Sequence, residues 1–174
     1  MSKPYILGID PSGSFKESKG TTGFALLSPD CIVVEHETVE AKHYSSQINY
    51  WVAVLKYIEM VINYVKSMNN QLVLSVEDYV LYAASAKAQI NSEMETSKLI
   101  GAITLIAYQK DIPMYIRSAS QVMNRWSNKI LEHKELIESK GNRYIDDNGD
   151  YFNPHSLDAL RHAVHCYHFE VDKK

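Results

Sequence analysis

The sequence has few of the residues that mark several special classes of protein. Its 174 residues include only two cysteines, Cys31 and Cys166, which excludes a disulfide framework and leads us to expect a reducing compartment. Seven glycines and five prolines are too few for a low-complexity or wholly disordered chain. No apolar run approaches the roughly 18 residues that span a bilayer, and the first residues lack a signal-peptide pattern. We therefore expect a single domain over residues 1–174, located in the cytoplasm and without a membrane partner.

The net charge is small, but the charged residues are unevenly distributed. The net charge of −3 argues weakly against a nucleic-acid partner. Residues 110–143 nevertheless carry +3, and the rest of the chain carries −6. Such a basic segment can steer a polyanion to one face, although a solvated helix with mixed charges would explain the same composition and is favoured by composition alone. The basic residues of this segment are Lys110, Arg117, Arg125, Lys129, Lys134, Lys140 and Arg143.

The spacing of apolar residues predicts an α/β fold. We expect strands at 5–10, 22–27, 31–37, 72–77 and 112–116, and helices at 46–68, about 94–106, from Ser118 or Ser120 to Leu131, and 155–169. The first three strands, on short connections, predict an antiparallel meander. The almost continuous apolar run of 72–77 is typical of a central strand covered on both faces. The sequence thus predicts a mixed sheet with helices on both faces, and a loop at the turn-rich residues 141–151.

Acidic residues end two of the predicted buried strands. Asp10 follows the first strand and Glu77 follows the fourth, and His155 and Asp158 share one face of the first turn of the closing helix. Clustered carboxylates need a cation, and oxygen-rich ligand sets suit Mg²⁺ or Mn²⁺, two of which could clamp a phosphodiester. Each acid alone has a simpler explanation, because Asp10 before Pro11 can start a turn and Asp158 can be a routine N-terminal helix charge.

Four segments of the chain, in this order, form a recognisable set. They are Ile6-Leu7-Gly8-Ile9-Asp10-Pro11, Thr22-Gly23-Phe24-Ala25, Val76-Glu77 followed by a small-residue stretch and a helix through Gly101-Ala102, and His155-Ser156-Leu157-Asp158-Ala159-Leu160 with Ala163. Together they resemble the RuvC family of Holliday junction resolvases. The resemblance covers almost the whole chain. It implies an RNase H-like five-stranded mixed sheet, with three antiparallel strands and then parallel strands. The compact, Asn- and Tyr-rich chain looks more like a phage-encoded member than a bacterial housekeeping one, and such a protein would act in the cytoplasm of a bacterial host.

The resemblance further implies the site and its chemistry. Asp10, Glu77 and Asp158 match the family's metal-binding acids, and His155 matches a position that holds Asp in some members and His in others. An imidazole at that position could bind one metal ion or deprotonate the attacking water. We therefore expect Mg²⁺ or Mn²⁺, two ions per active site, and a homodimer that cuts branched DNA with paired symmetric nicks.

Several residues are predicted to contact DNA. Lys134 falls near a basic residue that the family uses close to the scissile phosphate, and the loop after Asp10 is longer than in typical bacterial members. Tyr79 and Tyr82 lie just past the second acid, where the family's aromatics help to open the junction, although packing against the sheet is an equal alternative. The full predicted DNA-contact set is Lys16, Lys19, Tyr79, Tyr82, Arg117, Arg125, Lys129 and Lys134.

Other interpretations stay open. The chain could be an RNase H-like nuclease for forks or RNA–DNA hybrids, or a module that binds branched DNA without cutting. An actin-like ATPase would need two such domains, more than 174 residues hold. We interpret His162, His165 and His168 as surface or partly packed histidines rather than a zinc site, because they step round the closing helix. Trp51, the methionines and both cysteines are interpreted as core residues.

Overall fold

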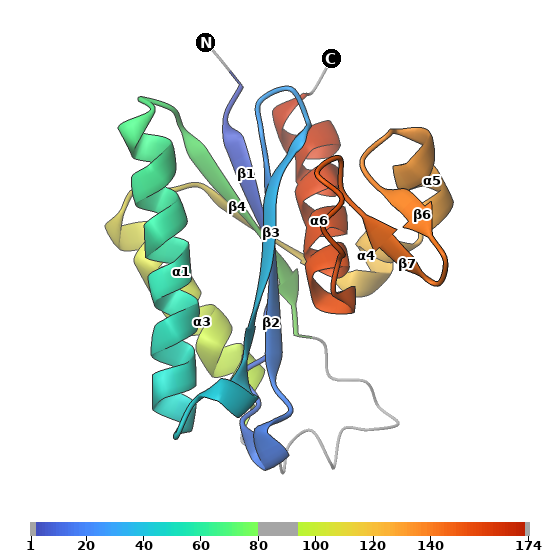
Figure 1. The fold of residues 1–174 in the computed structure, drawn as a ribbon. Coiled ribbons are helices and arrows are strands. Elements are labelled where there is room, and N and C mark those ends of the chain that lie inside the picture. The colour runs from blue at the N-terminus through green and yellow to red at the C-terminus, as the bar shows by residue number, and fades with distance from the viewer. Residues whose placement is uncertain (1–2, 80–93, 173–174) are drawn as a thin grey trace.

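Five strands form one mixed sheet in the order β3-β2-β1-β4-β5 (Figure 1). The computed structural model describes residues 3–79 and 94–172. Strands β1, β2 and β3 pair antiparallel, whereas β4 runs parallel to β1 and β5 runs parallel to β4. The predicted sheet is therefore confirmed. The strands are β1 Tyr5–Asp10, β2 Thr21–Leu27, β3 Val33–Glu40, β4 Leu72–Asp78 and β5 Met114–Ser118.

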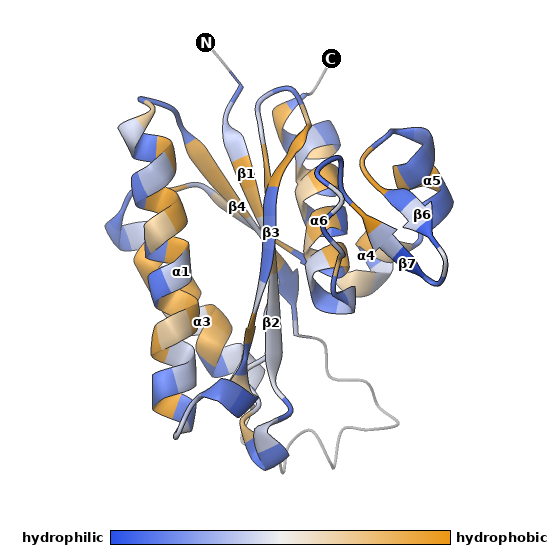
Figure 2. Cartoon of the chain, viewed as in Figure 1, coloured by the Kyte–Doolittle hydropathy of each residue, from blue (hydrophilic) through white to orange (hydrophobic). Residues whose placement is uncertain are grey.

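Helices cover both faces of this sheet. Helices α1 (Gln47–Ser67) and α3 (Glu95–Gln109) lie on one face, and α6 (Pro154–Cys166) lies on the other (Figure 1). Hydrophobic residues lie along the surfaces of α1 and α6 that face the sheet (Figure 2), and the buried side chains form two hydrophobic clusters, one on each face of the sheet. The α6 cluster also takes in the short helices α4 (Ala119–Met123) and α5 (Asn128–His133). No helix in the described ranges is long and apolar enough to cross a membrane.

Helix α1 shows how directly the apolar spacing determines a helix. The Ser46 hydroxyl caps the helix by accepting a hydrogen bond from the Asn49 amide at 3.2 Å. The buried side chains recur at three- and four-residue steps, so they form one stripe against the sheet. The helix ends where Asn69 takes a left-handed conformation with φ of 54°. The buried residues of the stripe are Tyr50, Val54, Ile58, Val61, Ile62 and Val65.

Small residues let α6 lie unusually close to the sheet. A Cβ on Gly8 of β1 would stand 1.9 Å from the Ala159 carbonyl oxygen, and a Cβ on Gly23 of β2 would stand 2.2 Å from the His155 carbonyl. On β4, the Ser75 hydroxyl donates to the His162 carbonyl oxygen at 2.8 Å. The close approach of backbone to backbone therefore depends on glycine or serine on three adjacent strands.

The structure corrects two predicted boundaries. The third strand begins at Val33 rather than Cys31, because Cys31 belongs to a turn, has φ of 62° and donates its amide to the Ser28 carbonyl. The closing helix ends at Cys166, and the chain continues as a π-helical turn over Tyr167–Val171.

Two predicted elements were wrong in kind. The single helix expected through Leu131 is divided into α4 and α5, because Ser127 has an extended backbone with ψ of 159°. Ser118 caps α4, with Gln121 completing a capping box. Residues predicted as loop instead include part of a hairpin of β6 (Glu138–Lys140) and β7 (Arg143–Ile145), which turns at Gly141 with φ of 65°. Gly141 supplies the positive φ that short hairpin turns require.

Core assignments from helical spacing were only partly right. Cys166 is buried, but Met60 and Met123 are 50% and 39% exposed and do not belong to the core. Trp51 is half-buried, and its indole nitrogen donates to the Gly13 carbonyl oxygen at 2.9 Å. Trp51 therefore packs against the edge of the hydrophobic cluster and also anchors the loop that follows β1.

Candidate active site

Two acidic side chains leave the sheet side by side. The last matched residues of the parallel pair β1 and β4 are Ile9 and Val76, so Asp10 and Glu77 come next on neighbouring strands. Side chains two residues apart on a strand point to the same face. Because Gly8 and Ser75 face α6, Asp10 and Glu77 face it as well.

The first turn of α6 brings two further groups to this edge. Asn153 caps the helix by accepting from the His155 amide at 3.0 Å, and the Ser156 hydroxyl accepts from the Asn153 amide at 3.1 Å. This cap fixes the turn that carries His155 and Asp158. The His155 Nδ1 atom lies 2.7 Å from Asp10 Oδ2, so the predicted first-turn histidine and the strand-end aspartate are in direct contact.

Each of the three carboxylates contacts one basic side chain of α6. Asp10 contacts His155, and Glu77 Oε2 lies 3.1 Å from His162 Nε2. Asp158 pairs with Arg161, three residues further along the helix. The His162 ring is completely buried. Asp10, Glu77 and Asp158 keep side-chain exposures of 15%, 23% and 31%, so all three remain accessible to solvent.

Burial and mutual repulsion affect how the carboxylates ionise. Burial raises the pKa of Asp10, the hydrogen bond with His155 opposes that rise, and the charge of Glu77 adds to it. Burial also raises the pKa of Asp158, with Arg161 opposing and both other acids adding. The hydrogen bond with Asp10 raises the pKa of His155. The three acids thus repel one another across this edge, which is the condition that favours a cation.

The chemistry of this donor set fits a hard divalent cation. Three carboxylates and one imidazole are the ligand types that suit Mg²⁺ or Mn²⁺. In the arrangement of residues 3–79 and 94–172, no three His, Cys, Asp or Glu side chains already stand together as a ligand group. The side chains contact the basic partners on α6 instead, so metal binding would require them to turn.

His162 and Arg161 are the site residues that sequence reasoning missed. His162 was grouped with His165 and His168, and the three were interpreted as surface or partly packed residues. The position of His162 in the sequence indicates a place in the site, because His162 lies seven residues after His155 and four after Asp158, on the same side of α6. Arg161 is also held by the Asn128 side chain and by the Trp126 carbonyl oxygen, to which its Nε donates at 3.0 Å. Neither of these two partners is close to it in sequence.

The residues predicted to contact DNA do not form one cluster. Lys16 and Lys19 are exposed in the loop after β1, where Lys19 pairs with Glu17. Tyr79 packs against the cluster on the α1 and α3 face, which favours the packing alternative for this residue. Tyr82 lies outside the described residues.

The four remaining cations lie on β5, α5 and the segment joining α4 to α5. Arg117 pairs with Glu170 at 2.5 Å, and the Arg125 guanidinium lies 4.8 Å from the Phe169 ring centre. Lys129 is exposed, and Lys134 Nζ lies 5.7 Å from the Trp126 ring centre. The positive charges of Arg117 and Arg125 both help to lower the pKa of His165, so these two side chains lie near the second half of α6.

Comparison with known proteins supports the fold. No family model and no curated protein matches the sequence. Among solved structures, the chain is similar to RuvC of T. thermophilus in complex with Holliday junction substrate. The TM-score is 0.61 at 17% identity, and the match covers 92% of this chain and 90% of that one. At this identity the likeness establishes the fold, which is RNase H-like as the sequence predicted.

Proposed function

We propose that the protein is a metal-dependent endonuclease that nicks branched DNA, with the four-way junction as its preferred substrate. The observation that carries the proposal is the meeting of Asp10, Glu77, His155 and Asp158 at one edge of an RNase H-like sheet. The similar fold of a junction-bound RuvC supports the choice of substrate.

Asp10, Glu77 and Asp158 would hold Mg²⁺ or Mn²⁺, with His155 beside them. The bound ions would stabilise negative charge on the scissile phosphate and acidify water. His155 keeps one ring nitrogen, Nδ1, on Asp10, and its side chain is 45% exposed. With the Nδ1 proton donated to Asp10, Nε2 can accept the proton of an attacking water, so we assign His155 as the general base.

Two symmetric nicks require two active sites, and we propose a homodimer through α3. The outward surface of this helix exposes Leu105 at 55% and Tyr108 at 85%, and an added Cβ on Gly101 would have no neighbouring atom of the described residues within 4 Å. Two large exposed apolar side chains beside a glycine suit a helix-to-helix contact. Replacing Leu105 with glutamate should convert the dimer to a monomer in analytical ultracentrifugation, and an unchanged sedimentation coefficient would exclude this interface.

The deciding experiment is cleavage of a labelled synthetic four-way junction in Mg²⁺, beside duplex, forked and RNA–DNA hybrid controls. Asp10→Asn should abolish cleavage and retain junction binding in Ca²⁺. Asp30→Asn is the matched control, because Asp30 is exposed in a turn between β2 and β3, and it should cut like the wild type. Cutting by Asp10→Asn at the wild-type rate would refute the site. Preferential cutting of forks or hybrids would refute the junction preference, and binding without any cutting would leave a binding module.

A further inference from the structure

A groove lies next to Asp158, on the side of α6 that carries the β6–β7 hairpin. Its volume is about 690 Å³, within the range of roughly 300–1,000 Å³ that ligand pockets occupy. Asp158 belongs to its wall, and Phe152 and Leu157 supply apolar surface. Arg143 and Tyr151 line it from the hairpin side. The groove therefore connects the candidate active site at Asp158 with a basic and aromatic surface at Arg143 and Tyr151.

Tyr151 presents an aromatic ring at this groove. Its side chain is 48% exposed, and two cations lie over the ring, with Lys140 Nζ at 5.7 Å and the Arg143 guanidinium at 5.6 Å from its centre. The backbone beneath it is fixed, because Tyr151 bridges to Ile145 and the Phe152 amide donates to the Tyr144 carbonyl at 2.9 Å. The ring is thus an anchored stacking platform flanked by positive charge.

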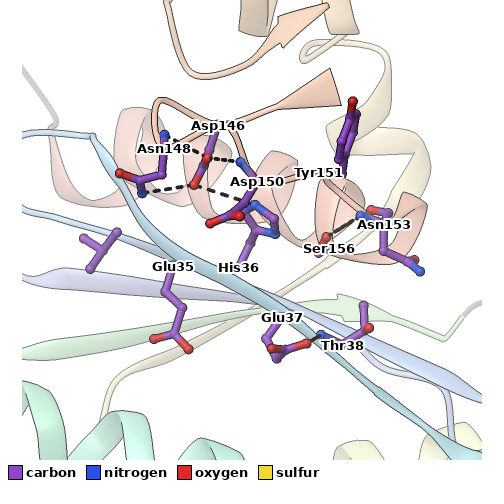
Figure 3. Close-up of a pocket in the computed structure, with 11 residues that line it drawn as sticks. Glu35, His36, Glu37, Thr38, Asp146, Asn148, Asp150, Tyr151, Asn153 and Ser156 are labelled. Carbon is purple, nitrogen blue, oxygen red and sulfur yellow. Dashed lines mark hydrogen bonds and ion pairs between the residues drawn. The ribbon is translucent and has the colours of Figure 1, made fainter. Parts of the chain in front are cut away.

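A second hollow, which Figure 3 shows, is rich in acidic lining residues. It measures about 440 Å³ and is lined by four carboxylates, with no lysine or arginine among its lining residues. Tyr151 and Asn153 line both hollows and so stand between them. A DNA strand that reaches Asp158 is repelled by the acidic hollow and attracted to the groove with Arg143. The four carboxylates are Glu35, Glu37, Asp146 and Asp150.

We propose that this groove is a nucleotide subsite for the strand being cut. The base of an unpaired nucleotide beside the scissile phosphate stacks on Tyr151, and its phosphate contacts Arg143 and Lys140. A branch point supplies such a nucleotide, because bases at the crossing can leave the stack at low cost, whereas bases within a duplex remain stacked. The inference rests on the proposed function, since it uses Asp158 as the place where the strand is cut.

The test compares Tyr151→Leu, which keeps bulk but removes the ring, with Tyr151→Phe, which keeps the ring. Tyr64→Leu is the matched control, because Tyr64 is 47% exposed on α1, across the sheet from α6. Tyr151→Leu should weaken binding of a four-way junction in Ca²⁺ by at least about fivefold, as loss of one stacked base does, and should leave duplex binding unchanged. Tyr151→Phe and Tyr64→Leu should bind like the wild type.

A second variant keeps the inference testable if Tyr151→Leu does not fold. Arg143→Gln should lower the slope of log affinity against log salt by about one, the share of one phosphate contact. Tyr151→Leu binding the junction as tightly as Tyr64→Leu, or an unchanged slope for Arg143→Gln, would overturn the subsite.

The outcomes also separate the subsite from the proposed function. If the wild type cuts junctions and these variants match it, the subsite is wrong and the function stands. If Tyr151→Leu binds weakly but the wild type never cuts, the subsite stands and the nuclease is wrong. A wild type that neither binds nor cuts branched DNA overturns both.

Discussion

Replacing Gly8 with alanine should damage folding and catalysis together. The added Cβ would stand 1.9 Å from the Ala159 carbonyl oxygen and 3.0 Å from the Ala163 Cβ, and both contacts are with α6. To restore ordinary contact, α6 would have to retreat by roughly 1.5 Å. Overpacking costs typically about 1–3 kcal/mol, and we expect about 3 kcal/mol because a backbone carbonyl cannot rotate away as a side chain can.

The same displacement acts on the site. The His155–Asp10 contact of 2.7 Å would lengthen beyond hydrogen-bond range if α6 retreated by that amount. A misplacement of about 1 Å can cost roughly a hundredfold in rate, so cleavage by Gly8→Ala should fall by at least that factor. With a urea m-value of about 2 kcal/mol/M, the unfolding midpoint should drop by about 1.5 M.

Gly101→Ala is the matched control when it is made in the Leu105→Glu background, where the proposed α3 interface is removed, because the identical substitution should there have the opposite effect on stability. Gly101 lies inside α3, and within residues 3–79 and 94–172 an added Cβ there would meet no atom within 4 Å. Alanine should therefore raise stability by about 0.5–1 kcal/mol through its higher helix propensity. A Gly8→Ala protein that unfolds within about 0.5 kcal/mol of the wild type, the usual range of a surface substitution, would refute the close packing of α6 on β1.

Three further predictions concern the second half of the chain. His162→Leu should lower the free energy of unfolding in urea by about 1–3 kcal/mol, because Glu77 loses its partner. It should also cleave DNA more slowly than His162→Gln, whose amide can still donate a hydrogen bond to Glu77. Equal cleavage rates for the two variants would contradict a role for this contact. Burial lowers the pKa of His165, so the unfolded chain binds the proton more tightly and stability should fall as pH drops below about 6.5. This loss of stability should be smaller in His165→Asn, and the free energies of unfolding of both proteins at pH 7.5 and pH 5.5 would measure the difference. Replacing both Lys129 and Lys134 with glutamine should reduce the salt slope of DNA binding by about two, and an unchanged slope would place the DNA elsewhere.

The sheet was predictable because its signals are local. Strands β1, β2 and β4 are short apolar runs that end at an acid or before a turn, and β1, β2 and β3 follow one another in the sequence without an intervening α-helix. Asp10 and Glu77 were predictable for the same reason, since both end buried strands. Their meeting follows from the parallel pairing of β1 with β4.

The partners of these acids were not predictable because they depend on side-chain packing between distant segments. His162 is 85 residues from Glu77. Its spacing from His155 and Asp158 places it on their side of α6, but that spacing does not identify Glu77 as its partner. The hairpin after α5 was missed because its strands are only three residues long, and at that length alternation cannot be told from loop. The break between α4 and α5 was missed because Val122, Trp126 and Ile130 keep a four-residue helical spacing across it.

One sequence pattern connects the packing to the site. Gly8 precedes Asp10 by two residues, and Ser75 precedes Glu77 by two. Because strand side chains alternate, each small residue points to the same face as the acid that follows it. The small residue lets α6 pack close to the strand, and the acid that follows can then contact side chains of α6. A small residue two positions before a strand-end acid therefore predicts a helix close enough to share the site, whereas the acid alone is equally consistent with a turn.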